Sequence, residues 1–224
     1  MTAAADDVRD PSLPGRLLAV ERDALIPLLR SRPDADFALP AAACPGWTVR
    51  DVLAHCSAAL IRVVEGRFEK GVFSPESNDR DIADRAEWTH ARVLDELERG
   101  MTEAGEVIAG RANGAWDAIA FGEWVHAGDV RDSLGESGAY TGAGRSDALS
   151  LLARVTRERG RPRLHADVDD VDAPLQLGAR SGTRTPARFI GDSATLVRLY
   201  TGRAVDGASY ELTGAAVEEL NLYG

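Results

Sequence analysis

The segment CPGWTVRDVLAH, residues 44–55, contains the clearest helix start in the chain. Thr48 is a residue type that caps helix N-termini, and Asp51 stands three positions later, where its carboxylate can return a hydrogen bond to the cap. Beyond Thr48, apolar side chains recur at helical spacing along one face. These are Val49, Val52, Leu53, Cys56, Ala59, Leu60 and Val63. The segment therefore predicts an amphipathic helix over about residues 48–66, with one face turned to a core.

The same apolar spacing predicts three more long helices, over about residues 12–32, 82–109 and 115–134. Pro27 is expected to kink or split the first of them. A polar loop at residues 74–78 leads to the third, and a shorter helix follows over 146–159. Four long helices joined by connections of modest length are typical of a four-helix bundle.

The sequence pattern changes after residue 160. Alternating or short apolar stretches predict strands near residues 164–168, 173–177, 187–190, 209–212 and 220–223. A helix is expected over 193–201, with Ser193 as its cap and Gly202 as its stop. The predicted fold class is α+β, with a helical bundle in residues 1–160 and a small α/β domain in residues 161–224.

Composition excludes several classes of protein. The 224 residues carry a net charge of −10, and residues 151–224 hold ten basic and ten acidic side chains, so the negative charge lies in the first 150. An acidic surface disfavours nucleic acid, which needs basic contacts to phosphate. No apolar run is long enough for a membrane helix, and the first ten residues lack the features of a signal peptide. We expect a cytoplasmic protein without nucleic-acid or membrane partners.

Phosphate-binding loops, dinucleotide fingerprints, nucleophile elbows and the His-Glu-x-x-His motif are all missing from the sequence. Among the four histidines, His55 lies at the edge of the inward face of its helix. His126 follows Glu123 and precedes Asp129, and all three lie within one arc of the fourth helix. A histidine and a carboxylate on one inner face are what a metal site in a bundle requires. The alternative is that the histidines are ordinary core or flank residues.

Two cysteines are too few for a disulfide framework, and both are expected to be small buried hydrophobes. Cys56 follows His55 directly, which leaves open a place next to a metal. His90, on a charged helix, and His165, in a strand, are expected to have no functional role.

Three segments resemble the mycothiol-dependent maleylpyruvate isomerase family. Residues 44–55 resemble its PGWTVRDLLAHL segment, and HAGDVRDSLG at 126–135 resembles its HxxDxRRxLG stretch. ATLVRLYTGR at 194–203 resembles its LLxLLTGR helix, in a C-terminal domain of sterol-carrier-like type. The first motif is the most specific and the third the least. Together they cover most of the chain in the family's order.

The resemblance implies a DinB-like four-helix bundle that binds one divalent metal, most often zinc, through three ligands with one open position. The family pairs a histidine at the position of His55 with a Glu-x-x-x-His pair on the last bundle helix. His126 matches the second histidine, but Gly122 stands where the glutamate is expected. Glu123 is one place off and would ligate only with a local change of helical register. Asp129 is the other carboxylate within reach, more suited to orienting His126 than to ligating.

The activity that the resemblance implies is thiol activation. A metal favours the thiolate of mycothiol, which adds to an electrophilic carbon; loss of the thiol after bond rotation gives an isomerase, and retention of the adduct gives an S-transferase. An anionic substrate favours an arginine, whose planar group matches a carboxylate. We expect Arg203 to be this catalytic residue, with Arg131 as a second candidate. Arg203 would have to reach the bundle from the C-terminal domain.

A second hypothesis comes from Gly122. It is a non-catalytic small-molecule-binding or stress-response protein on the same scaffold, with a degenerate metal site. Metal content separates the two hypotheses. The expected partner is a small molecule, in the first case an anionic electrophile, and the chain is expected to be a monomer or a homodimer.

Overall fold

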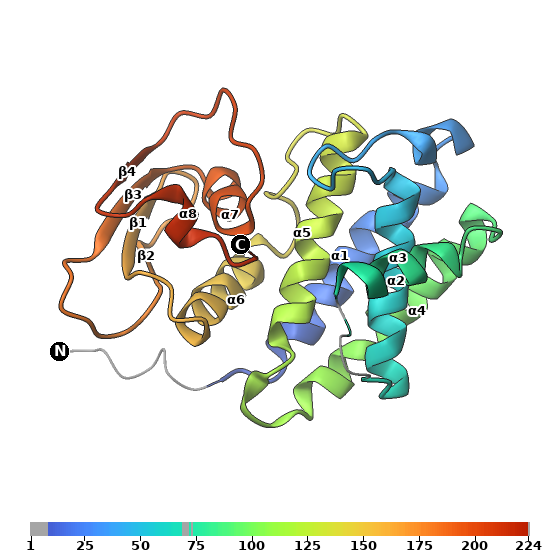
Figure 1. Cartoon of the computed structure of the whole chain (residues 1–224), viewed down its shortest axis with the longest axis horizontal. Helices are drawn as coiled ribbons and strands as arrows, with labels where there is room; N and C mark the ends of the chain where they lie inside the picture. Colours follow the sequence, from blue (N-terminus) through green and yellow to red (C-terminus); the bar gives the residue numbers. More distant parts are fainter. Residues whose placement is uncertain (1–8, 69–71, 73, 224) are drawn as a thin grey trace.

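The structure is a computed structural model, and it describes residues 9–68, 72 and 74–223. Two layers of secondary structure lie side by side, a helical bundle and a small sheet with its own helices (Figure 1). The bundle region contains α1 (Leu13–Arg30), η1 (Asp34–Ala38), α2 (Val49–Glu65), α3 (Pro75–Ala83), α4 (His90–Ala109), η2 (Ala112–Gly114) and α5 (Asp117–Ser133). The remainder contains α6 (Arg145–Glu158), β1 (Leu164–Val168), β2 (Leu175–Leu177), β3 (Ala187–Gly191), α7 (Ser193–Thr201), β4 (Glu211–Thr213) and α8 (Val217–Leu220).

The bundle is built from α1, α2, α4 and α5, which bury their apolar faces against one another. The predicted start of α2 is confirmed: the Thr48 hydroxyl accepts from the Asp51 N–H, and the Asp51 carboxylate accepts from the Thr48 N–H. Gly66, in the left-handed region at φ 66°, ends the helix. Pro27 does not split α1, because it lies in the last turn before Arg30.

Two sequence predictions in the middle of the bundle were wrong. The expected polar loop at residues 74–78 is the start of α3, where the Ser74 hydroxyl accepts from the Ser77 N–H and Pro75 occupies the first turn. The third long helix begins at His90 rather than near residue 82, because Thr89 provides its N-cap. A short polar helix shows little apolar periodicity, so α3 gives a weak sequence signal.

The sheet has the order β2-β1-β3-β4, in which β1 and β3 are parallel and both edge strands are antiparallel to their neighbours. Leu164, Ala166 and Val168 of β1 are buried while the residues between them are exposed, so one face of the sheet is covered. Figure 1 shows α6 and α7 between the sheet and the bundle. The strand predicted at 220–223 is absent: Leu220 ends α8, and Leu222 instead donates one backbone hydrogen bond to Tyr200.

The α+β fold class is therefore confirmed. The predicted division at residue 160 falls in the connection from α6 to β1, although α6 packs against both α5 and β2. Side-chain ion pairs also link the two regions: Arg198 of α7 binds Asp132 at 3.1 Å, and Arg203 after α7 binds Asp129. The candidate site lies at this junction.

Candidate metal and thiol site at the junction of bundle and sheet

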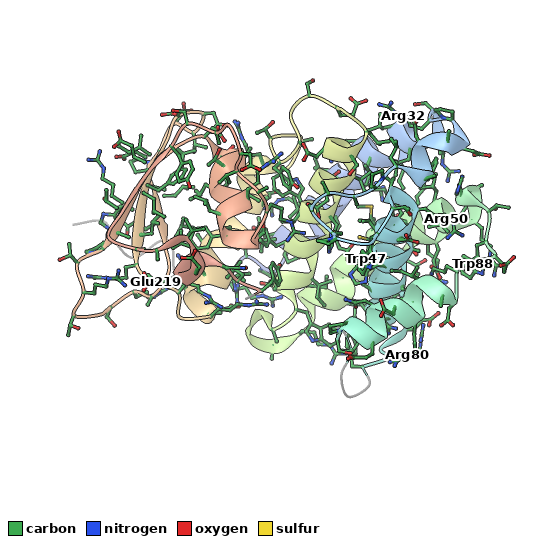
Figure 2. All side chains as sticks on the ribbon, turned by 45° about the horizontal axis from the view of Figure 1, so that its top comes forward. Arg32, Trp47, Arg50, Arg80, Trp88 and Glu219 are labelled. Carbon is green, nitrogen blue, oxygen red and sulfur yellow. The ribbon has the colours of Figure 1, made fainter. Side chains whose placement is uncertain are left out.

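The loop before α2 folds tightly and carries Cys44 towards α5. Pro40 and Thr48 form a β-bridge, and the Ala41 N–H donates to the Trp47 carbonyl at 2.9 Å. Gly46 adopts φ 88°, a conformation that glycine tolerates without strain. In Figure 2 the Trp47 side chain lies beside α2, far from Glu219 in the sheet region. The short segment that resembles the family thus brings Cys44 and His55 to one place.

His55 and His126 face one another across the junction of α2 and α5. Their ring centroids are 5.4 Å apart and the rings are nearly perpendicular, at 82°. His55 is buried, and its Nδ1 has no hydrogen-bond partner among the described residues. Burial, with smaller effects from His126 and Arg62, lowers the pKa of His55 to about 3. His55 is therefore a neutral imidazole, the form that binds a metal.

Asp129 is the centre of the polar network on α5. Its Oδ2 lies 2.9 Å from His126 Nδ1, and its two oxygens accept from Arg203 Nε at 3.1 Å and Nη2 at 2.7 Å. The Tyr140 hydroxyl donates to Oδ1. Burial opposes ionisation, but the hydrogen bonds from His126 and Arg203 outweigh it and hold the pKa of Asp129 well below its usual range. Asp129 is therefore a buried, ionised acceptor that fixes the His126 ring.

Arg203 reaches the bundle from the end of α7. Besides its paired contact with Asp129, Nη1 donates to the Thr201 carbonyl at 2.6 Å. A guanidinium has five N–H groups, so two remain beyond these contacts. Tyr140 has a positive φ of 65°, which is unusual for a residue with a side chain. Its buried hydroxyl thus supports Asp129 from a constrained backbone position.

Cys44 also lies close to His126 and Asp129. Its Sγ lies 3.6 Å from Asp129 Oδ2 and 3.9 Å from His126 Nδ1. Burial, together with the charge of Asp129, raises the pKa of the Cys44 thiol to about 12. Cys44, His126 and Asp129 form a group whose ligand atoms all lie within 4.8 Å of one another. No cluster of His, Cys, Asp and Glu as compact as this one includes Glu123 in the part of the chain that is described.

Glu123 is buried on α5 three residues before His126, and its carboxylate contacts Cys56 of α2. Burial is the largest effect on this group and raises its pKa to about 8, and Oε2 has no hydrogen-bond partner among described residues. A cavity of about 10 Å³ is lined by Glu123, Cys56 and His126, roughly enough for one water molecule. α5 is an uninterrupted α-helix from Asp117 to Ser133, without the change of register that ligation by Glu123 was expected to need.

The other residues considered in the sequence analysis, Arg131, His90 and His165, lie away from the junction. Arg131 forms an ion pair with buried Glu21 at 2.6 Å, so it supports the bundle rather than the junction. His90 stacks on Phe37 with ring centroids 4.2 Å apart, and His165 is exposed in β1.

A family model described as the mycothiol maleylpyruvate isomerase N-terminal domain matches residues 18–137, more than half of the chain. The chain belongs to this family. Two solved structures are similar: a mycothiol-dependent maleylpyruvate isomerase, with a TM-score of 0.55, and a histidine-to-alanine mutant of such an isomerase, with a TM-score of 0.54. Each is 18% identical to this chain, and each match covers 93% of this chain and 95% of the other.

At this identity the two isomerase structures establish a shared fold over both regions of the chain. None of the curated proteins matches the chain. No helix in the described ranges is long and apolar enough to cross a membrane.

Sequence reasoning missed two members of the junction. Cys44 was interpreted as a buried hydrophobe, although it stands at the start of the segment that leads to His55, and that position was the available signal. Tyr140 gave no signal, because its approach to Asp129 depends on the path of the loop after α5.

Proposed function

We propose that the protein is a metal-dependent, mycothiol-using isomerase or S-transferase that acts on an anionic electrophile. One observation carries the proposal: the buried imidazole of His55, with an Nδ1 unpartnered among the described residues, meets the half-buried imidazole of His126, which Asp129 holds next to an arginine from the C-terminal region. The family membership gives this arrangement its chemical direction.

The residues present fit a divalent metal, and zinc best. His55 has a buried nitrogen without a partner, and a buried polar atom of this kind is costly unless a ligand satisfies it. Imidazole nitrogen, thiol sulfur and carboxylate oxygen are the donors that zinc takes in proteins. His55 and His126 would hold the metal. Such a metal would supply Lewis acidity, which favours the thiolate of a bound thiol substrate.

The chain's own residues have separable tasks in this proposal. Asp129 holds His126 Nδ1, an outer partner that fixes ring orientation. Arg203 anchors Asp129 and retains two N–H groups for a substrate carboxylate, whose flat geometry a guanidinium matches. Because Arg203 lies in the C-terminal region, it would take part both in substrate binding and in joining the two regions, which the Arg198–Asp132 ion pair also links.

The second candidate is a non-catalytic small-molecule-binding or stress-response protein. Two observations favour it: Gly122 supplies no carboxylate, and Cys44, His126 and Asp129 satisfy one another's hydrogen bonds without a metal. A protein of this kind would bind its ligand at the junction without turning it over.

The test combines zinc-loaded protein, mycothiol and maleylpyruvate, with products followed by chromatography and mass spectrometry. Metal-dependent conversion with mycothiol regenerated identifies an isomerase, and a stable thiol adduct identifies an S-transferase. Both are expected to disappear in His126→Ala and to persist in His165→Ala, a control on the exposed face of β1. Zinc-loaded protein that gives neither product with this pair or with other anionic electrophiles would favour the binding protein.

A further inference from the structure

One stretch of α5 at the junction remains partly open to solvent. Between Phe121 and Val130, Gly122 and His126 are half-buried, while the other residues are buried. Gly122 lies one helical turn before His126, so the two positions share a face of the helix. A ligand that reaches His126 from solvent would therefore lie against this face of α5.

The side chain of Tyr223 comes to the same face from the C-terminal region. A β-carbon built at Gly122 would lie 3.9 Å from the Tyr223 hydroxyl. Apart from the helix backbone and the two adjacent residues, no other described atom would lie within 4 Å of it. The glycine therefore leaves open space on α5, and a phenolic hydroxyl borders that space.

The C-terminal segment is fixed in this place by contacts that leave the hydroxyl free. The N–H of buried Leu222 donates to the Tyr200 carbonyl at 2.8 Å, and its carbonyl accepts from Arg159 Nη1. The Arg159 guanidinium also lies 5.2 Å from the centre of the Tyr223 ring, a cation–π contact. In Figure 1 the segment after α8 runs from the sheet region towards α5.

The Tyr223 hydroxyl can donate to a ligand. It has no hydrogen-bond partner among the described residues, whereas the backbone N–H of Tyr223 donates to Asn221 Oδ1 at 2.9 Å. The side chain is 52% exposed, so a ligand can reach it. Burial of the hydroxyl end raises its pKa, and the nearby charges of Arg159, Arg203 and Asp129 have smaller effects. The hydroxyl is therefore protonated at neutral pH and is a donor.

We infer that Tyr223 is a substrate-binding residue of the junction. Its hydroxyl donates a hydrogen bond to an anionic group of the ligand that Arg203 also binds, and Gly122 leaves the space for that ligand. This inference rests on the proposed function, from which it takes an anionic ligand beside Arg203. Donors from two separate side chains favour a ligand with two acceptor groups, so the substrate class is a dicarboxylate rather than a neutral electrophile.

Binding of maleate tests the hydroxyl without requiring turnover, since no thiol is present to form an adduct. Isothermal titration calorimetry is performed on the zinc-loaded, full-length wild type, Tyr223→Phe and Tyr210→Phe. Tyr223→Phe removes the hydroxyl and keeps the ring beside Arg159. Tyr210 is the matched control, because its ring stacks on Phe189 of β3, with centroids 6.2 Å apart. Zinc content is measured for every sample, and turnover of maleylpyruvate with mycothiol is assayed in parallel.

Tyr223→Phe should bind maleate roughly tenfold to a hundredfold more weakly than the wild type, the usual effect of losing a hydrogen bond to a charged group. Tyr210→Phe should bind as the wild type does, and zinc content should be unchanged in both. In turnover, Tyr223→Phe should raise KM more than it lowers kcat.

Equal maleate affinities in Tyr223→Phe and the wild type, or equal weakening in the two variants, would overturn the inference and leave the proposed function intact. A wild type that binds no maleate at millimolar concentrations would also overturn it, while its turnover of maleylpyruvate decides the proposed function separately. Maleate binding that depends on Tyr223, in a protein without turnover, would support the inference and contradict the catalytic function.

Discussion

Glu123 and Asp129 are two buried carboxylates of α5, and they have opposite character. Burial raises the pKa of Glu123 to about 8, and the hydrogen bond with Cys56 offsets this only in part. Asp129, less than two turns later, is equally hidden but receives hydrogen bonds from Arg203, Tyr140 and His126, and its pKa falls. Burial alone therefore does not decide the charge of a group, because partners from other elements do. The polar junction lies where the C-terminal region supplies those partners.

The largest expected effect is the loss of Asp129. In metal-free Asp129→Ala, the buried charge of Arg203 loses its carboxylate partner, which should lower the free energy of unfolding by about 3–5 kcal/mol. Urea denaturation measures the change. Asp132→Ala is the matched control, since its ion pair with Arg198 also joins bundle to α7 but is exposed and should cost at most about 1 kcal/mol. Equal losses in the two variants would contradict the distinction.

Glu123 should make the stability of the protein depend on pH. Its folded-state pKa of about 8 lies above the usual 4.5, so between these values the folded state holds a proton that the unfolded state has released. The free energy of unfolding therefore falls as pH rises through this window, by about 1.4 kcal/mol per unit.

Glu123→Gln removes this titration. In denaturation of the metal-free proteins, the stability of the variant relative to the wild type should increase by about 3 kcal/mol from pH 5 to pH 8. Parallel curves would show that Glu123 is ionised in the folded protein.

Gly128, next to Asp129 on α5, tests how closely the Tyr140 ring packs against the helix. A β-carbon there would lie 2.5–2.6 Å from ring atoms of Tyr140, so Gly128→Ala should lower the free energy of unfolding by about 1–3 kcal/mol through overpacking. It should also displace the tyrosine hydroxyl from Asp129. Thermal and urea unfolding give the first quantity, and an unchanged stability would indicate that the loop after α5 moves freely.

Gly122 should show the smallest effect and the reverse sign. Its β-carbon position is in ordinary contact with the Tyr223 hydroxyl at 3.9 Å, and alanine is preferred to glycine within a helix by roughly 0.5–1 kcal/mol. Gly122→Ala is therefore expected to stabilise the protein by about that amount in the same denaturation experiment. Destabilisation would mean that the glycine is needed for close packing.

The bundle could be predicted because its signals are local. The cap at Thr48, the apolar face of α2 and the stop at Gly66 are all encoded within one helix. The polar helix α3 was missed because its residues lack a continuous apolar face. The order of the sheet, with β1 beside β3, depends on contacts between distant segments and is absent from any local pattern.

The candidate site could be predicted only where its signals are local. His55, His126 and Asp129 were found from a motif and from helical spacing, and Arg203, after α7, forms an ion pair with Asp129. The approach of Cys44 and Tyr140 to Asp129 is tertiary and could not be read from spacing. The roles of the residues at this junction remain predictions until the metal is measured.

Metal content is the most direct test of the central claim, that His126 belongs to a metal site. Untagged protein is loaded with zinc, desalted and subjected to elemental analysis, alongside His126→Ala and the exposed control His165→Ala. The account predicts about one zinc per chain in the wild type and in His165→Ala, and almost none in His126→Ala. A wild type that holds no zinc, or a His126→Ala variant that holds as much as the wild type, would contradict it.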